Sequence, residues 1–149
     1  MKSIVIVGFG GFGREVAWLA NECGREVLGF LDDNIEPGNQ LSYTILGALD
    51  SWRNYSDSEF VVAIGNPRVR KKIVERLSDQ GLRSFATLVD PSVKMAESVS
   101  VGEGSVVCAG TIATVDIDIG DHVIINLNVT LGHDDKIFDY VTVAPMVAL

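Results

Sequence analysis

Residues 119–137 read Ile-Gly-Asp-His-Val-Ile-Ile-Asn-Leu-Asn-Val-Thr-Leu-Gly-His-Asp-Asp-Lys-Ile, and every sixth residue in this stretch is a branched apolar one. The same spacing continues through the rest of the C-terminal half and gives eleven apolar residues in a row: Val89, Met95, Val101, Val107, Ala113, Ile119, Ile125, Leu131, Ile137, Val143 and Leu149. Because apolar residues make up about half of an ordinary chain, chance would produce such a run about once in two thousand cases. A period of six therefore organises this half of the sequence.

A second column of apolar residues lies four positions after the first and includes Val93, Val99, Ile117, Val123, Val129, Val141 and Val147. Glycine follows the first-column residue at Gly102, Gly120 and Gly132. In a parallel β-helix each six-residue unit supplies one flat side and one corner, three units complete a coil, and stacked coils bury the apolar column. Ordinary strands would alternate with a period of two and have no fixed corner. We therefore expect residues 87–149 to form a left-handed parallel β-helix.

The first half of the chain alternates strand and helix signals. Residues 4–7, Ile-Val-Ile-Val, are typical of a strand buried on both faces. Further strand signals lie at residues 27–31, 60–64 and 85–89, and helical spacing is found at 14–23, at 48–54 and after Pro67. This alternation predicts a small Rossmann-like parallel sheet with helices against it, spanning residues 1–86.

Composition and charge exclude several classes of partner. The formal net charge of −8 argues against nucleic acid or an anionic membrane, which both favour clustered Lys and Arg. Arg68, Arg70, Lys71 and Lys72 form the only dense basic cluster, which lies in a helix-like stretch. Arg70 is also a candidate for nucleotide binding, but a charged helix face explains it as well. No apolar run approaches the roughly 20 residues of a membrane span. The two cysteines are far apart and indicate no disulfide framework, so we expect a cytoplasmic protein.

A glycine-rich loop follows the first expected strand. Gly8-x-Gly10-x-x-Gly13 has the form of a dinucleotide-binding motif, with Asp32 about 20 residues further on. In a nicotinamide-dependent enzyme the loop would bind the pyrophosphate at the helix N-terminus. About 85 residues before the repeat are too few for a six-stranded dinucleotide fold, however. The same loop would suit the nucleotide of a sugar nucleotide, or it would simply pack the helix on the strand.

His133 and Asp134 lie in one expected corner of the β-helix. An imidazole has the pKa required of a general base near neutral pH, and a neighbouring carboxylate fixes its tautomer and stabilises the imidazolium. The alternative is an imidazole on a polar corner without a catalytic role. For His122, which follows Asp121 in an ordinary corner, we expect this second situation.

Taken together, the repeat, the segment at residues 125–134 and the segment Gly-Phe-Gly-Gly-Phe-Gly-Arg-Glu at residues 8–15 resemble the sugar O/N-acyltransferase family of hexapeptide-repeat proteins. That family includes sialic acid O-acetyltransferases and acetyltransferases of amino-sugar nucleotides. The resemblance implies a small Rossmann-like N-terminal domain, a left-handed β-helix and acetyl-CoA as donor, with no metal. It also implies a homotrimer with active sites between subunits.

The resemblance further assigns roles to individual residues. His133 matches the catalytic histidine and Asp134 the acidic residue after it. The residues expected to bind the nucleotide are Gly10, Gly11, Gly13, Asp32, Asp33 and Asn66. Thr142 stands where some members carry a second histidine near the acetyl group, and the backbone amide of Ala144 would serve as oxyanion donor. Phe138 departs from the family pattern, which has glycine there.

These observations predict acetyl transfer from acetyl-CoA to an amino or hydroxyl group of a nucleotide-linked sugar in surface-polysaccharide synthesis. Two alternatives are a nicotinamide-type Rossmann protein and a non-catalytic module that binds a sugar nucleotide. Residues 89–149 amount to little more than three coils of 18 residues. We therefore expect a shortened member of the family, in which acetyl-CoA binding is impaired.

Overall fold

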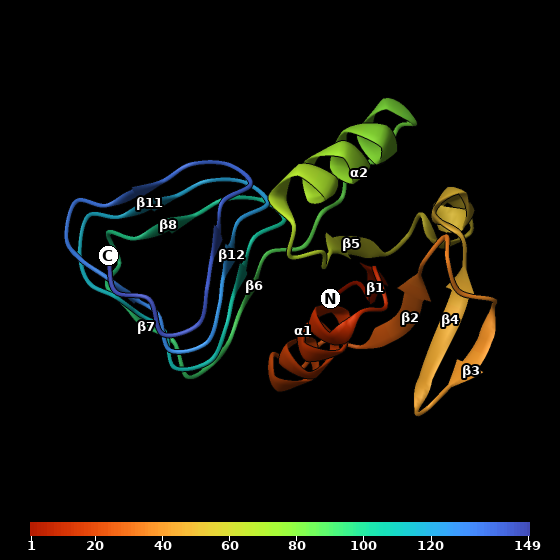
Figure 1. Ribbon diagram of the computed structural model, residues 1–149, viewed down its shortest axis with the longest axis horizontal. Coiled ribbons are helices and arrows are strands. Elements are labelled where there is room, and N and C mark those ends of the chain that lie inside the picture. The colour runs from red at the N-terminus through yellow and green to blue at the C-terminus, as the bar shows by residue number, and fades with distance from the viewer.

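The computed structural model describes residues 1–149 and contains an α/β unit followed by a triangular stack of coils (Figure 1). The helices and strands of the first unit are β1 (Ile4–Val7), α1 (Gly11–Glu22), β2 (Val27–Leu31), β3 (Gly38–Gln40), β4 (Tyr43–Gly47), the 3₁₀ helix η1 (Leu49–Tyr55), β5 (Glu59–Val62) and α2 (Pro67–Asp79). The expected strands at residues 4–7 and 27–31 are confirmed with these bounds, and the expected elements at residues 14–23, 48–54 and 60–64 shift by one to three residues at their ends.

The α/β unit has a five-stranded sheet in the order β3-β4-β2-β1-β5. The pairs β1–β2, β1–β5 and β2–β4 are parallel, and only the edge strand β3 is antiparallel to its neighbour. β1 lies inside the sheet with all four residues buried, as its β-branched sequence predicts. The β3–β4 hairpin was not expected, because residues 36–39 have only a turn signature.

Helices cover both faces of this sheet. Side chains of α1 pack on one face with Ile4, Ile6 and Phe30, whereas α2 and η1 pack on the other with Val5, Val7 and Phe60. Each helix therefore buries the apolar stripe that its sequence predicts. Neither helix combines the length and the hydropathy that a bilayer-spanning segment requires.

The second unit consists of ten two-residue strands in three parallel sheets. One sheet has the order β15-β12-β9-β6, and the others are β13-β10-β7 and β14-β11-β8. The strands are β6 (Leu88–Val89), β7 (Lys94–Met95), β8 (Ser100–Val101), β9 (Val106–Val107), β10 (Ile112–Ala113), β11 (Asp118–Ile119), β12 (Ile124–Ile125), β13 (Thr130–Leu131), β14 (Lys136–Ile137) and β15 (Thr142–Val143). This is the left-handed β-helix that the period of six predicts.

The register of the coils is fixed at 18 residues. Ile125 pairs with Val107 on one side and with Val143 on the other. In each two-residue strand, the second residue belongs to the predicted apolar column. Corners are equally regular, because each hexapeptide from residue 102 on has one residue with a positive φ: Gly104, Gly110, Asp116, His122, Asn128, Asp134, Tyr140 and Met146. Six of these eight are not glycine, so the stacked coils impose a backbone conformation that L-residues otherwise avoid.

The two units meet along one side of the triangle. Apolar residues of α1 share a cluster with Leu88, Val106 and Cys108 on the outer face of the β15-β12-β9-β6 sheet. The expected strand at residues 85–89 is divided between the units: Phe85 forms a parallel bridge with Phe60, and β6 begins the first coil. The prediction of one continuous strand there is wrong, because the chain leaves one sheet and enters another within these residues.

A test of the β-helix compares two residues of the same apolar column. Ile125 is fully buried between coils, whereas Met95, in the first coil, is 42% exposed. We expect Ile125→Ala to lower the free energy of unfolding by about 2–5 kcal/mol and Met95→Ala by about 1 kcal/mol or less. Urea denaturation followed by circular dichroism measures both. Equal losses would contradict the stacked-coil interior.

Candidate functional site

The glycine loop connects β1 to α1, and its glycines have different roles. A Cβ atom on Gly13 would overlap the carbonyl oxygen of Gly8, so the absence of a side chain permits the close approach of the helix to the strand end. Gly10 is the N-cap of α1, and neither it nor Gly11 faces atoms that a Cβ would overlap. Gly13 therefore serves the packing of α1, while Gly10 and Gly11 leave the N-terminus of the helix open.

Asp32, at the end of β2, braces this loop. One carboxylate oxygen accepts a hydrogen bond from the backbone N–H of Phe9 at 3.0 Å, and the other accepts from the N–H of Asn34 at 2.9 Å. Both oxygens of Asp32 are therefore engaged with the main chain. The carboxylate fixes the position of the glycine loop against the end of β2.

A cavity of about 180 Å³ lies at the carboxyl ends of β1 and β2, where parallel sheets commonly bind ligands. Its walls also include residues of η1 and α2. The lining residues are Val7, Gly8, Leu31, Asp32, Asp33, Asn34, Leu49, Ile64, Val69, Ile73 and Arg76. Of the residues predicted to bind a nucleotide, Asp32 and Asp33 line this cavity.

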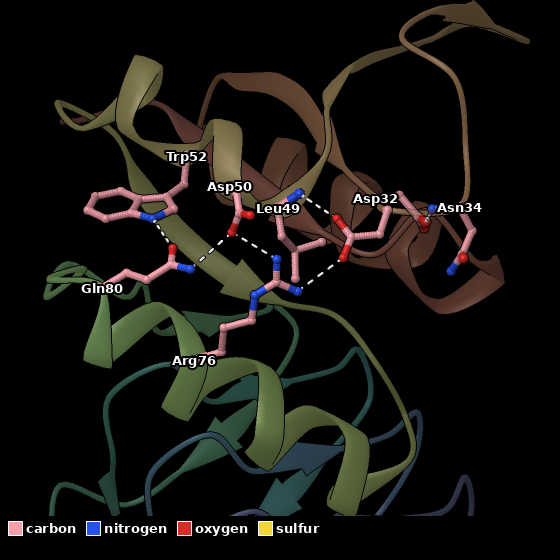
Figure 2. A network of polar contacts seen from close by, with 8 residues as sticks. Asp32, Asn34, Leu49, Asp50, Trp52, Arg76 and Gln80 are labelled. Atoms are coloured by element: carbon pink, nitrogen blue, oxygen red, sulfur yellow. Dashed lines mark hydrogen bonds and ion pairs between the residues drawn. The ribbon is translucent and has the colours of Figure 1, made fainter.

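A polar network closes one side of the cavity (Figure 2). Asp33 accepts hydrogen bonds from the N–H of Leu49 at 2.8 Å and from Arg76 at 3.1 Å. Arg76 also binds Asp50 at 2.8 Å, and Gln80 donates to the same carboxylate at 3.0 Å. The indole of Trp52 donates to Gln80 at 2.9 Å. The network thus connects η1 and α2 across the end of β2.

The charges of this network stabilise one another. Hydrogen bonds from Gln80 and Arg76 lower the pKa of Asp50, and the two carboxylates raise the pKa of Arg76. A guanidinium and a carboxylate side by side present donors and acceptors together, which suits the edge of a nucleobase. Arg76 was not predicted from the sequence, although it extends the helical spacing of Val69 and Ile73, which line the same cavity.

Asn66 has a structural role at the start of α2. Its side-chain oxygen accepts hydrogen bonds from the backbone N–H groups of Arg68 and Val69, which makes it the N-cap of the helix. It does not line the cavity. The position that the sequence predicts for nucleotide binding is therefore occupied by a helix cap.

His133 and Asp134 form a hydrogen-bonded pair in the corner between β13 and β14. The Nδ1 atom of His133 lies 2.7 Å from a carboxylate oxygen of Asp134, and the side chains are 80% and 75% exposed. This bond raises the pKa of His133. Asp134 has a φ of 66°, and this break in the strand alternation brings two successive side chains together.

Within one chain, the cavity and the His133–Asp134 pair lie far from each other. The α/β unit packs against the β15-β12-β9-β6 side of the triangle, whereas the corners that join the β7 and β8 columns, to which His133 belongs, lie on the opposite side (Figure 1). The two groups of predicted site residues are therefore not assembled into one site within this chain.

Thr142 and Ala144 lie in the last coil. The Thr142 hydroxyl donates to the carbonyl oxygen of Gly65 at 2.7 Å, so it contacts the turn between β5 and α2. Ala144 follows β15 and is exposed. Phe138, which departs from the family pattern, is 74% exposed at a corner.

Two residues that we expected on the surface from the sequence, Arg70 and His122, are buried. Arg70 is only 1% exposed, and its guanidinium donates hydrogen bonds to main-chain carbonyls of both units. His122 is 7% exposed, with its ring stacked on Tyr140 and in edge contact with Phe85. Burial lowers the pKa of His122. The expectations of a charged helix face for Arg70 and a surface imidazole for His122 are therefore wrong, because this corner is where the two units meet.

A Gly-rich α/β unit followed by a left-handed parallel β-helix is the architecture of hexapeptide-repeat sugar acyltransferases. Residues 3–77 match the PglD N-terminal domain family, and the chain belongs to this family of hexapeptide-repeat proteins. No group of three or more His, Cys, Asp or Glu side chains is arranged to hold a metal ion.

Two curated relatives are nucleotide-sugar N-acetyltransferases. The chain is 37% identical over 114 residues to UDP-N-acetylbacillosamine N-acetyltransferase of Bacillus subtilis (strain 168), a match that covers 73% of this chain and 52% of the relative. It is 27% identical over 147 residues to GDP-perosamine N-acetyltransferase of Escherichia coli O157:H7, with 94% and 66% covered. The chain thus spans about half of the first relative and about two thirds of the second.

Solved structures of acetyltransferases also resemble this chain. PerB from Caulobacter crescentus, in complex with CoA and GDP-perosamine, superposes with a TM-score of 0.88 at 31% identity, covering 99% of this chain and 71% of that one. The acetyltransferase domain of PglB from Neisseria gonorrhoeae FA1090, in complex with acetyl coenzyme A, superposes with a TM-score of 0.85 at 26% identity, covering 97% and 71%. Both the fold and the relative placement of the two units are therefore shared with acetyltransferases.

Two glycines of the loop provide a matched pair of variants. We expect Gly13→Ala to destabilise the α/β unit by several kcal/mol, since the added Cβ overlaps the Gly8 carbonyl. Gly10→Ala meets no atom within 4 Å, and the variant should remain folded with a stability change of about 1 kcal/mol or less. Thermal unfolding compares them. A Gly13→Ala protein as stable as the wild type would show that the helix does not approach the strand end this closely.

The two histidines should titrate on opposite sides of the ordinary imidazole pKa of about 6.5. Asp134 raises the pKa of His133, and burial lowers that of His122. NMR observation of the two ring C–H signals across the pH range measures both. Asp134→Asn should lower the pKa of His133 and leave His122 unchanged. Two coincident titrations near the ordinary value would disprove the placement of both rings.

Proposed function

We propose that this protein transfers an acetyl group from acetyl-CoA to the amino group of a nucleotide-linked amino sugar in the cytoplasm. The observation that carries the proposal is the hydrogen-bonded His133–Asp134 pair on an exposed corner of the β-helix. The similarity to N-acetyltransferases of UDP- and GDP-linked amino sugars favours nitrogen over oxygen as the acceptor atom. The product would serve the synthesis of surface polysaccharides.

The pair suits the chemistry of acetyl transfer. His133, held by Asp134 through Nδ1, would present Nε2 to the acceptor and remove its proton as the nitrogen attacks the thioester carbon. A C–N bond then forms, the C–S bond breaks, and the proton passes on to the departing thiolate of CoA. Asp134 stabilises the imidazolium during this step. Thr142, which lies on the side of the α/β unit, and the amide of Ala144 are our candidates for contacts with acetyl-CoA that reacts at the His133 of a neighbouring copy.

Residues 1–86 would bind the nucleotide. The cavity lined by Asp32, Asp33 and Arg76 would take the base and ribose, and the open N-terminus of α1 at Gly10 and Gly11 would take the diphosphate. Residues 87–149 would carry the acetyl transfer.

We propose that the protein acts as a homotrimer, and the separation of these two places supports a site shared between subunits. The cavity and His133 lie on opposite sides of the β15-β12-β9-β6 sheet of one chain, so a sugar bound to this cavity would reach the His133 of a neighbouring copy. Packing of β-helices around a threefold axis would bring the cavity of one subunit toward the corner of the next.

The reaction can be followed by release of the CoA thiol from acetyl-CoA with UDP- and GDP-linked 4-amino sugars. We expect His133→Ala to reduce kcat/KM by about 10²–10⁴-fold. Lys136→Ala, an exposed residue of the following strand, is the matched control and should be unaffected. Retained nucleotide binding with no turnover by the wild type would instead support a non-catalytic binding module.

The pH dependence tests the role of Asp134. A general base is active when neutral, so the rate should fall as the pH drops through the pKa of His133. Because Asp134 raises that pKa, Asp134→Asn should shift the acidic limb of kcat/KM to lower pH while it lowers the maximum. An acidic limb that does not move would argue against this base. Quenching of Trp fluorescence by NADH, but not by sugar nucleotides, would favour the nicotinamide alternative.

A further inference from the structure

Arg70 joins the α/β unit to the β-helix through main-chain carbonyls. Its Nε donates to the carbonyl oxygen of His122 at 2.8 Å, one terminal nitrogen donates to Ile64 at 2.6 Å, and the other donates to Tyr140 at 2.6 Å. Longer bonds reach Gly65 and Val141. The guanidinium thus connects the end of β5 with two successive coils.

Only a guanidinium suits this arrangement. Its donors lie in one plane and point in fixed directions, whereas an ammonium group is a single point with three donors. No carboxylate accepts from Arg70, so the carbonyl oxygens alone compensate for its burial. Burial lowers its pKa to about 10, which leaves the group charged at neutral pH.

The same turn and helix form part of the nucleotide cavity. Val69, Ile73 and Arg76 of α2 line the cavity, and Ile64 lines it from the end of β5. Arg70 lies between these positions on the helix and holds the carbonyl of Ile64 itself. The wall of the cavity is therefore connected to the β-helix through one side chain.

The other main contact between the units does not fix their relative angle, so this angle depends on Arg70. The apolar cluster of α1 with Val106 and Cys108 holds the units together at a different place, where one hydrogen bond, from the Cys23 thiol to the carbonyl of Val89 at 3.2 Å, is also made. This contact is mostly apolar, and apolar packing is not directional. It would allow the α/β unit to rotate on the β-helix if the directional contact were lost. The Thr142–Gly65 hydrogen bond is the only other polar side-chain contact near Arg70 that joins the turn after β5 to the coils.

We propose that Arg70 is a positioning residue that fixes the angle of the nucleotide-binding unit on the β-helix and thereby determines where the bound sugar is presented for acetyl transfer. The inference rests on the proposed function for its catalytic consequence, but the angle is a property of the chain itself. It also explains why a basic residue occupies the apolar stripe of α2, beside Val74 and Leu77.

The kinetic test uses Arg70→Lys and Arg70→Met, with Lys72→Met as the matched control on the exposed face of the same helix. We expect both Arg70 variants to bind the sugar nucleotide within about twofold of the wild type and to lose on the order of 10²-fold in kcat, because small misplacements of a substrate have effects of this size. The control should match the wild type. A Lys variant with full kcat, or a loss confined to nucleotide affinity, would overturn the proposal.

A second measurement does not depend on activity. Spin labels at Glu75→Cys and Lys136→Cys, on exposed sites of α2 and β14, report the distance between the units by double electron–electron resonance. Cys23→Ser and Cys108→Ala remove the native thiols, and dilution with unlabelled protein isolates the distance within one chain. We expect a narrow distribution with Arg70 and a broad one with Lys or Met, and a Met variant as narrow as the parent would refute the role of Arg70. If the wild type shows the narrow distribution but no acetyl transfer, the proposed function fails while the inference stands.

Discussion

The closure of one coil every 18 residues is the constraint on which the rest of this structure depends. Each hexapeptide ends in a corner whose left-handed residue sits at the same position, and parallel hydrogen bonds hold that position above its equivalents in neighbouring coils. Columns of residues 18 apart are therefore direct neighbours in space. One such column contains His133, and another contains His122 and Tyr140, which stack on each other.

This regularity separates two kinds of corner. At the corner of His133 and Asp134 both side chains are exposed, and they form a hydrogen bond with each other. At the corner of His122 the aromatic rings and Arg70 form the contact with the α/β unit. The same imidazole group is therefore available for proton transfer in one corner and is a packing element in the other. Position in the hexapeptide and environment both distinguish them, because His122 is the corner residue with a positive φ, whereas His133 precedes the corresponding residue Asp134.

The sequence predicted the β-helix well because its information is periodic and local. The apolar column was placed to the residue, as Ile125 and Leu131 illustrate, since every coil repeats the same physical requirement. Contacts between the units carry no such signal. Arg70 binds main-chain carbonyl oxygens, and because every residue has such a carbonyl, the residue types do not reveal which one is an acceptor. Its position among the apolar residues of α2 was the one available hint.

The candidate nucleotide site was predicted in part. Asp32 and Asp33 follow a strand whose end is a natural binding edge, and both line the cavity, while their binding of a nucleotide stays a prediction. Asn66 was expected there by the same rule but caps a helix instead, a role that Asn fulfils at least as often. Arg76 and Asp50 were missed because their pairing depends on the packing of η1 against α2.

The central claim is that the nucleotide cavity of one chain serves the histidine of another, and mixed oligomers test it most directly. Co-expression of His133→Ala with Ile73→Trp, whose indole would fill the cavity, combines two proteins that should each be inactive. Random mixing would restore about a quarter of the wild-type activity if each site draws its cavity and its histidine from different subunits. A mixture as inactive as either parent would contradict the account.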